Sequence, residues 1–359
     1  MKEFKIAAIP GDGIGKEVLA EGIEVLNFIG SRDIGVKFVI EKFDWGCEYY
    51  LKHGRMMDAD GIETLKKYDA IILGAVGSPE VPDYISTREL IIKVRQGLNQ
   101  YVNLRPTKLL KNVECPLKNK TPEDIDMVFV RENIEGEYSG IGGILKAGTP
   151  EETAIQTSVF TRKNTEKLME YAFKLAQKRP RKKLTSITKS NALNYSMVFW
   201  DKIFREKSEK YSDIATDKIH IDAASMYLVK KPEKFDVVVA SNLFGDIITD
   251  LGAAIQGGLG FAAGGNINPD REFPSMFEPI HGSAPYMAGK GIANPIATIW
   301  AIVLMFEHLG LDEQAATLMK SIEDALVNKE RLTRDLGGQG STSEVGDYIC
   351  ELYSKNIAK

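Results

Sequence analysis

The chain has 359 residues, of which 43% are hydrophobic and 27% charged, and its formal net charge is -4. This length exceeds the size at which one hydrophobic core usually stops growing, so two domains of an ordinary globular protein are expected. The net negative charge argues against a nucleic-acid partner, and the best apolar stretch, Ile299–Phe306, is far shorter than the ~20 residues of a membrane span.

Near the N-terminus, strand-like segments alternate with helix-like ones. Strands are predicted at Lys5–Pro10, Val36–Phe43 and Ala70–Leu73, and helices at Lys16–Phe28 and Gly61–Lys67. Four further strands are assigned to a second domain: Ile125–Arg131, Leu184–Thr188, Lys218–Ile221 and Asp236–Ala240. This alternation predicts an α/β fold with a mostly parallel sheet covered by helices.

Two segments depart from this alternation. Glu135–Phe160 is rich in Gly, Thr and Ser with alternating apolar positions, which predicts a β-hairpin. Because a lone hairpin is marginal in water, we expect it to pair with another chain. Leu259–Pro279 is glycine-rich and lacks a helical period, so a long functional loop is expected there.

Cysteines and basic residues give no sign of a metal or nucleic-acid site. Cys47, Cys115 and Cys350 lie far apart without paired spacing, which predicts structural thiols in a reducing compartment. The start of the chain lacks the apolar core of a signal peptide, so a cytoplasmic protein is expected. The basic run Lys178–Lys183 is interpreted as a solvated loop before a strand.

Two glycine turns follow predicted strands. In Pro10–Glu17 a dinucleotide fingerprint fails, because Lys16 stands where G-x-G-x-x-G requires a small residue. The turn suits either close approach to a ligand or a purely structural role. A second turn, Gly74–Gly77, ends another strand at the same edge of the sheet, which favours a cleft there.

Asp246 and Asp250 follow the apolar strand that ends at Ala240 and lie four residues apart on a predicted helix, so they share a face. Ligands bind open α/β sheets beyond the carboxyl ends of their strands, and two carboxylates there suit a hard divalent cation. A solvated helix N-terminus, where acidic side chains favour the macrodipole, explains the pair equally well.

Other chemistry-bearing residues also follow strands. Arg95, Arg105 and Arg131 suit carboxylate recognition through their planar forks, although each is equally explained as an ion-pair partner. Lys189 ends a strand, where it is either an acid or base of lowered pKa or a capping lysine. The irregular loop from Phe277 to Pro285 and the segment Ala293–Pro295 suit an adenine nucleotide.

Together and in this order, these motifs resemble the β-decarboxylating dehydrogenases of isopropylmalate, isocitrate, homoisocitrate, tartrate and D-malate, and the similarity runs essentially end to end. Phe43–Trp45, Tyr49–Gly54 and Val238–Asp246 look most like the tartrate/D-malate branch. The resemblance implies an isopropylmalate/isocitrate dehydrogenase-like fold of two α/β domains without a Rossmann motif. Residues 1–100 and 257–359 would form the nucleotide-binding domain and 101–256 the dimerisation domain, with the active site between them.

The resemblance also implies a role for each candidate residue. The metal aspartates match Asp222, Asp246 and Asp250, and the catalytic residues match Tyr138, Lys189 and Asp222. The substrate-binding residues match Arg95, Arg105, Arg131 and Ser86. The nucleotide-binding residues match Gly74, Ala75, Val76, Glu278, His281, Gly282, Ser283, Ala284 and Asn294.

The resemblance implies that this chain catalyses NAD-dependent oxidation of a small 2-hydroxy acid, followed by loss of carbon dioxide. It also implies Mg²⁺ or Mn²⁺, and a monovalent cation such as K⁺, as further cofactors. A homodimer is implied, in which Lys189 and Asp222 reach into the neighbour's site and the hairpin at about 135–160 forms an intersubunit sheet. D-Malate or tartrate is the expected substrate.

Two departures from the branch leave alternatives open. Ser86–Ile92 differs from the branch pattern in the segment that faces the variable part of the substrate. Arg88 would add a carboxylate contact and favour a dicarboxylic or tricarboxylic substrate, whereas Leu90 and Ile91 would line an apolar pocket, as for isopropylmalate. Tyr286 replaces the aspartate of NAD-using relatives, yet no basic cluster for NADP is added. A non-catalytic regulatory subunit is disfavoured because every matched catalytic residue is present.

Overall fold

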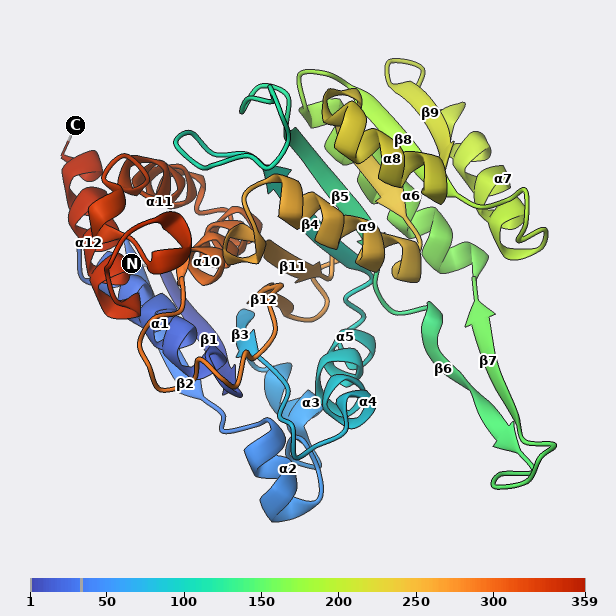
Figure 1. Ribbon diagram of the computed structural model, residues 1–359, viewed down its shortest axis with the longest axis horizontal. Coiled ribbons are helices and arrows are strands. Elements are labelled where there is room, and N and C mark those ends of the chain that lie inside the picture. The colour runs from blue at the N-terminus through green and yellow to red at the C-terminus, as the bar shows by residue number, and fades with distance from the viewer. Residues whose placement is uncertain (1, 33–34, 359) are drawn as a thin grey trace. The chain divides into compact units, whose positions relative to one another are not determined.

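The computed structural model describes residues 2–32 and 35–358, which form two compact units. Unit 1 contains Met1–Gln100, Leu109–Lys118 and Ala253–Lys359, and unit 2 contains Tyr101–Lys108 and Asn119–Gly252. Both units are α/β, as the alternation of strand-like and helix-like segments predicts (Figure 1).

Unit 1 is built on five strands in the order β2-β1-β3-β12-β11, of which only β11 runs antiparallel to its neighbour β12. The strands are β1 (Lys2–Gly11), β2 (Val36–Lys42), β3 (Ala70–Ala75), β11 (Ala263–Ile267) and β12 (Ser275–Pro279). The longer helices are α1 (Gly15–Arg32), α10 (Ile296–Leu309), α11 (Asp312–Ala325) and α12 (Thr342–Ile357). Short helical segments are α2 (Cys47–His53), α3 (Gly61–Leu65), α4 (Asp83–Ser86), the π-helix η1 (Thr87–Ile92), α5 (Lys93–Gly97), η3 (Leu259–Phe261), η4 (Lys329–Arg331) and η5 (Arg334–Leu336).

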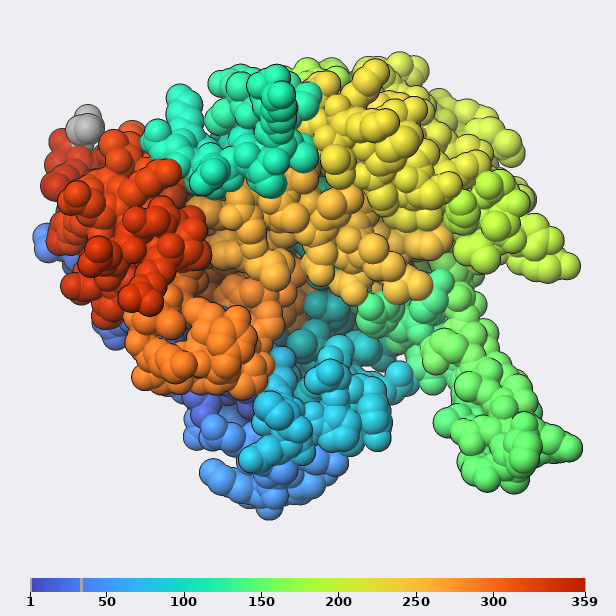
Figure 2. Space-filling view, viewed as in Figure 1, coloured from blue at the N-terminus to red at the C-terminus, as the bar shows by residue number. Residues whose placement is uncertain are grey.

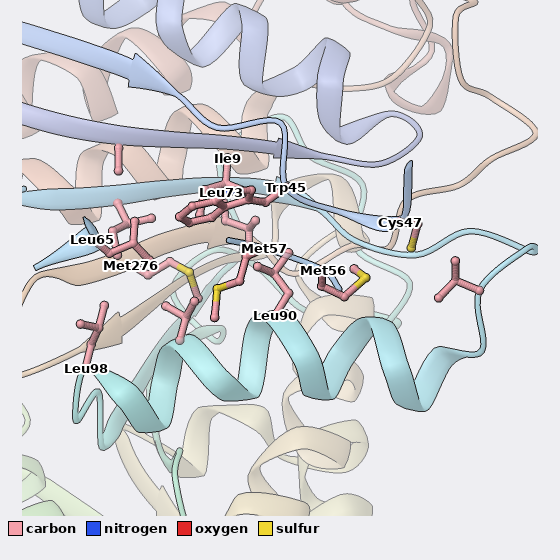
Figure 3. Packing of buried hydrophobic residues seen from close by; sticks show 14 residues of the cluster. Ile9, Trp45, Cys47, Met56, Met57, Leu65, Leu73, Leu90, Leu98 and Met276 are labelled. Atoms are coloured by element: carbon pink, nitrogen blue, oxygen red, sulfur yellow. The ribbon is translucent and has the colours of Figure 1, made fainter. Parts of the chain in front are cut away.

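A large apolar cluster fixes the helical segment α4–η1–α5 against this sheet. Trp45, Met57 and Leu73 pack there with Leu90, which projects from η1 into the cluster (Figure 3). Burial of side chains of this size stabilises a fold by roughly 1.5–3 kcal/mol each relative to exposure. The segment that carries Ser86 and Arg95 is therefore held rigidly on the sheet of unit 1.

Helix α10 contains the apolar stretch noted in the sequence. It is buried from Ile296 to Phe306 between β12 and the neighbouring helices α1 and α11, so it is apolar on all sides because it is a core helix. Across residues 2–32 and 35–358, no helix combines the length and the apolar character that crossing a membrane requires.

Unit 2 has a second five-stranded arrangement in the order β4-β5-β10-β8-β9, in which only β4 is antiparallel to its neighbour. Its strands are β4 (Val102–Lys108), β5 (Asp126–Glu132), β8 (Lys183–Thr188), β9 (Ala215–His220) and β10 (Val237–Ala240). Its helices are α6 (Arg162–Lys178), α7 (Ser196–Ser208), α8 (Ile221–Lys230), η2 (Pro232–Lys234) and α9 (Asn242–Ile255), which begins in this unit.

The predicted hairpin is present as β6 (Gly136–Leu145) and β7 (Thr153–Val159), which pair antiparallel. It stands away from the rest of unit 2, and its tip has few neighbours within that unit (Figures 1 and 2). Four apolar side chains on it are at least half exposed: Ile141, Ile144, Leu145 and Ile155. Its pairing with a second chain stays a prediction.

Two expectations drawn from the sequence are wrong. Leu259–Pro279 is not a long loop, because β11 and β12 lie within it and pair antiparallel, with Gly264 opposite Glu278. Both strands are buried on both faces, but their sequences, with two glycines and an asparagine in β11 and a glutamate and a proline in β12, lack the continuous apolar run that marks a buried strand. The basic run is not simply solvated either: Arg179 forms ion pairs with Asp126 at 2.9 Å and with the fully buried Asp236 at 2.5 Å.

Candidate functional site

The candidate residues of unit 2 lie at one edge of its sheet. Strands β5, β10, β8 and β9 run parallel, so their carboxyl ends meet at the same edge, where α/β sheets usually bind ligands. Arg131 lies near the end of β5, α9 follows β10, Lys189 follows β8, and Asp222 lies in the first turn of α8 after β9.

Arg131 is held at the start of α9. Its side chain is 1% exposed and pairs with the Asp246 carboxylate. Its Nε and Nη2 donate to Asn242 Oδ1 at 3.1 and 2.7 Å. Gly245 makes room for this arrangement, because a Cβ there would lie 2.5 Å from Arg131 Cγ. The guanidinium is therefore fixed in position by α9 itself.

Arg105 reaches the same helix from β4. Its Nη1 donates to Thr249 Oγ1 at 2.6 Å, and Nε donates to Asn103 Oδ1 at 3.0 Å. Its guanidinium nitrogens lie 3.5 Å from Asp246 and 4.0 Å from Asp250. Two buried arginines from neighbouring strands thus converge on the acidic face of α9, which gives the edge both a carboxylate-binding and a cation-binding character.

Tyr138 completes this cluster from the base of the hairpin. Its hydroxyl donates to Asp246 Oδ2 at 2.8 Å, and the Arg131 guanidinium lies 5.4 Å from its ring centre. The base of the hairpin is held by Glu132, whose carboxylate accepts from the backbone N–H of Ile134 and from Asn164 Nδ2, both at 2.8 Å. Burial raises the pKa of Glu132, and these hydrogen bonds oppose that rise.

Asp246 and Asp250 fit a divalent cation on the chemistry of their donors. They lie on one face of α9 with side chains 39% and 66% exposed. Both Asp246 oxygens already have partners, Oδ1 in Arg131 and Oδ2 in Tyr138, so an ion there would share them with these residues. The pKa of Asp250 is raised, first by desolvation and also by the charge of Asp246, while Arg105 opposes the rise. A hard cation would relieve this repulsion, and carboxylate oxygens are its preferred ligands. The cation site at Asp246 and Asp250 stays a prediction.

Asp222 does not join these two aspartates within one chain. Its Oδ1 accepts from Lys189 Nζ at 2.9 Å, and this hydrogen bond lowers the pKa of Asp222. Strand β9 lies two positions from β10, or roughly 10 Å at ~4.8 Å per strand, which separates Asp222 from Asp246. No group of three potential ligands forms anywhere in the described ranges. That Lys189 and Asp222 serve a neighbouring chain stays a prediction.

In unit 1, three loops meet at the carboxyl ends of the adjacent parallel strands β1, β3 and β12. Asp12 N donates to Ala75 O at 2.7 Å, and Ile14 N donates to Ser283 O at 2.8 Å. Gly13 has φ +54°, and a Cβ there would lie 2.0 Å from Ser283 O. The glycine turn of residues 10–15 therefore approaches the protein's own backbone, which supports its structural interpretation.

Asp12 ties these loops together further, and sequence reasoning missed it. Its buried carboxylate accepts from Gly77 N and from Cys47 N, each at 2.9 Å. Burial, with the nearby Asp12 carboxylate, raises the pKa of the Cys47 thiol to about 12, so this thiol is a structural group and not a nucleophile. The predicted segment Gly74–Val76 is thereby held in place from both sides.

The predicted nucleotide loop carries one unsatisfied buried group. His281 Nε2 is buried and has no hydrogen-bond partner in the described structure, and burial lowers the pKa of the ring. Such an atom fits contact with a bound polar ligand. Asn294 is engaged within the protein: its Nδ2 donates to Asp335 Oδ2 at 2.9 Å and its Oδ1 accepts from Ile296 N at 3.0 Å.

The remaining candidates belong to unit 1 and have internal partners. Arg95 Nη2 donates to Glu278 Oε1 at 2.8 Å, with both side chains more than nine-tenths buried. Ser86 is buried, and its hydroxyl donates to Asp83 O at 3.1 Å. Leu90 packs in the core, whereas Arg88 is exposed.

Sequence reasoning also missed Asn242, Thr249 and Asn266. Asn242 stands just after the buried strand β10, which was an available signal. Thr249 lies further along α9, between Asp246 and Asp250, where the spacing of the aspartates was the available signal. Asn266 lies inside β11, and nothing in its local sequence marks it.

Comparisons with known proteins agree along the whole chain. A D-malate dehydrogenase [decarboxylating] of Escherichia coli is 51% identical over 359 residues, covering 98% of this chain and 99% of that protein. A probable tartrate dehydrogenase/decarboxylase of Agrobacterium vitis is 51% identical over 350 residues, covering 98% of each. The crystal structure of isocitrate dehydrogenase from Methylococcus capsulatus has a TM-score of 0.87 and 34% identity, covering 98% of this chain and 99% of that one.

The family model described as isocitrate/isopropylmalate dehydrogenase matches residues 5–349. This match includes the arginines and aspartates clustered at α9, the hairpin and the three loops of unit 1. The chain belongs to the isocitrate/isopropylmalate dehydrogenase family.

Proposed function

We propose that this protein is an NAD-dependent, decarboxylating dehydrogenase of D-malate or tartrate that uses Mg²⁺ or Mn²⁺. The observation that carries the proposal is the convergence of Arg105, Arg131 and Tyr138 on Asp246. Relatives with about half of their residues identical over essentially the full length are named for these two activities.

In this proposal the arginines recognise the substrate. Arg105 and Arg131 are buried and fixed by Thr249 and Asn242, so their orientation toward a carboxylate costs little conformational entropy on binding. Asp246 currently neutralises part of their charge, and its engagement with a cation would release that charge for an anionic substrate. The same residues thus prepare the site for a chelating hydroxy acid.

Asp246 and Asp250 would hold the divalent cation, with Asp222 of a neighbouring chain as a third ligand. The bound cation supplies Lewis-acid polarisation of the substrate's hydroxyl and keto oxygens. The proposed proton donor is Tyr138, whose hydroxyl lies next to Asp246 and therefore close to the proposed cation. Lys189 and Asp222 form a hydrogen-bonded acid–base pair whose proposed task is to take the proton of the substrate hydroxyl.

We assign the nicotinamide cofactor to unit 1. The loops at 74–77 and 281–284, with Glu278 and Asn294, would bind it, and the unpartnered His281 Nε2 supports that assignment. NAD is preferred over NADP because no added basic cluster accompanies the exposed Tyr286. Bound NAD supplies the hydride acceptor for the alcohol carbon.

One structural observation favours D-malate or tartrate over isopropylmalate. Leu90 was a candidate for an apolar substrate pocket, but it is 1% exposed and packs in the core of unit 1. The segment from Ser86 to Ile92 therefore offers less apolar surface to a substrate than its sequence suggested.

We further propose a homodimer that pairs through the β6–β7 hairpin. Both strands expose apolar side chains, and a two-stranded hairpin is marginal unless other strands or a packing surface support it. A second copy of the chain would supply that surface and, with it, Lys189 and Asp222.

The test is an assay of the purified protein with NAD or NADP and with Mg²⁺ or Mn²⁺ against D-malate, tartrate, isopropylmalate, isocitrate and homoisocitrate. We expect NAD reduction with D-malate or tartrate, release of one carbon dioxide per hydride with D-malate, and loss of turnover in a chelator. Asp246→Asn should abolish turnover, whereas Asp213→Asn, at an exposed carboxylate of the same unit, should not. Faster turnover of isopropylmalate than of D-malate would contradict the proposed substrate.

A further inference from the structure

The ion pair of Arg95 and Glu278 is unusual in this protein because it lies out of water. Their side chains are 9% and 8% exposed, and Arg95 Nη2 donates to Glu278 Oε1 at 2.8 Å. Asn266 Nδ2 donates to the same oxygen, also at 2.8 Å. Desolvation makes such pairs a costly way to stabilise a fold, so a role beyond stability is worth testing.

Both partners retain capacity for a ligand. Arg95 Nε is buried and has no hydrogen-bond acceptor among the described residues. The two side-chain hydrogen bonds of Glu278 both use Oε1, so Oε2 is left for other donors. The arginine thus has an unused donor that could bind an anion. The glutamate has an unused acceptor that could bind a hydroxyl group.

We propose that the Arg95–Glu278 pair couples substrate binding to nucleotide binding, so that each ligand increases the affinity of the other. The inference rests on the proposed function, in which Arg95 contacts the carboxylate of the hydroxy acid and Glu278 contacts the nucleotide. Asn266 is a positioning residue in this unit, because it fixes Glu278 Oε1 and thereby orients Oε2.

The sign of the coupling follows from charge sharing. A substrate carboxylate at Arg95 takes part of the positive charge that now neutralises Glu278. The glutamate then becomes a stronger hydrogen-bond acceptor, and the hydroxyl groups of a nucleotide ribose are donors that satisfy it. Coupling is reciprocal, so the nucleotide must strengthen substrate binding by the same factor. An effect of about tenfold lies in the range of known couplings.

The experiment titrates NADH fluorescence on the whole protein with Mg²⁺, with and without saturating D-malate. NADH and a hydroxy acid cannot react with each other because both are in the reduced state, so a stable ternary complex is measured. For the wild type we expect the Kd of NADH to fall about tenfold when D-malate is present. The Glu278→Gln variant carries a neutral amide, which does not become a stronger acceptor when Arg95 binds the substrate. In this variant D-malate should change the Kd of NADH by no more than about twofold, so the ratio of the two Kd values falls to about two or less.

Arg95→Lys serves as the second variant because it preserves the charge balance of the buried pair. An ammonium lacks the planar fork that contacts Glu278 and a second anion together, so the ratio should again fall to about two. Matched controls are Glu351→Gln and Arg331→Lys in the exposed Arg331–Glu351 pair of unit 1, which should keep the wild-type ratio. A purely structural role would change the melting temperature of the variants without changing the ratio.

Two results would overturn the inference while leaving the proposed function intact. The first is a wild-type protein that oxidises D-malate but binds NADH equally well with and without it. The second is an Arg95→Lys variant in which D-malate still lowers the Kd of NADH as much as in the wild type. If Glu278→Gln does not bind NADH measurably, the Arg95→Lys ratio decides. A wild type that does not oxidise D-malate contradicts the proposed function itself, and the coupling falls with it.

Discussion

The lack of a side chain at Gly245 leaves the space in which Arg131 lies. The glycine lies in the first turns of α9, and the aliphatic part of Arg131 fills the space where its Cβ would be, with Cγ at 2.5 Å and Cβ at 2.8 Å. Arg131 has no freedom to move aside because it is buried and pairs with Asp246 and Asn242. Position 245 therefore determines where the guanidinium lies.

Gly245→Ala should displace Arg131, lower kcat/KM by at least about tenfold, and destabilise unit 2 by roughly 1–3 kcal/mol through overpacking. Steady-state kinetics and denaturant unfolding measure the two effects. Gly30→Ala is the matched control, since this helical glycine of α1 has only an ordinary contact at 3.4 Å to Phe38. Wild-type kinetics in Gly245→Ala would show that Arg131 is not positioned by this contact.

At the residue scale, the sequence identified the candidate side chains but not the residues that hold them in place. Arg105, Arg131, Tyr138 and Asp246 were all candidates, and the structure brings them together at one edge of the sheet. Their supports were missed because a polar residue near a helix start, such as Asn242, and a threonine inside a helix, such as Thr249, are both common without any functional role. The Arg95–Glu278 pair joins residues 183 positions apart, and such a contact has no local signature.

Among the elements, residue composition decided which strands could be predicted. The buried strands β3 and β10 were predicted because each is a continuous apolar run, whereas β11 contains two glycines and an asparagine, and β12 contains a glutamate and a proline, so both were mistaken for a loop. The π-helix η1 was not predicted. A π-helical turn adds one residue per turn, so it alters which side chains face the core, and here it turns Leu90 inward and leaves Arg88 outside.

At the scale of elements, the β6–β7 hairpin is predicted to form the contact between two chains. Ile144 is 60% exposed in the single chain, so Ile144→Lys should leave the fold of that chain unchanged but break an apolar interface on the hairpin. We expect sedimentation analysis to find a dimer for the wild type and mostly monomer for the variant, with an unchanged circular dichroism spectrum. Val327→Lys, at an apolar residue of unit 1 that is 72% exposed, controls for the added charge. A variant that remains dimeric would exclude this part of the hairpin from the interface.

At the scale of the whole molecule, the partly buried His308 makes stability depend on pH. Burial, with the charge of Arg271, lowers the pKa of His308 from 6.5 to about 4. The ring lies beside Phe277 near the end of α10, with 5.7 Å between ring centres. Between these two pKa values the unfolded chain binds a proton that the folded chain excludes, so acid favours unfolding.

We expect wild-type stability to decrease as the pH falls from 6.5 toward 4, and His308→Gln to lose less stability over the same range. Denaturant midpoints measured across this range test the expectation, with His53→Gln at an exposed position of α2 as the control. Parallel curves for the wild type and His308→Gln would show that other groups cause the acid sensitivity.

The strand order of unit 1 also means that its sheet cannot be completed until late in synthesis of the chain. Strands β2, β1 and β3 are made within the first 75 residues, but the neighbour of β3 on its other side, β12, is encoded two hundred residues later. Until then one edge of β3 has no partner, and unpaired strand edges invite aggregation. The nascent chain must therefore keep this apolar edge protected while unit 2 is synthesised.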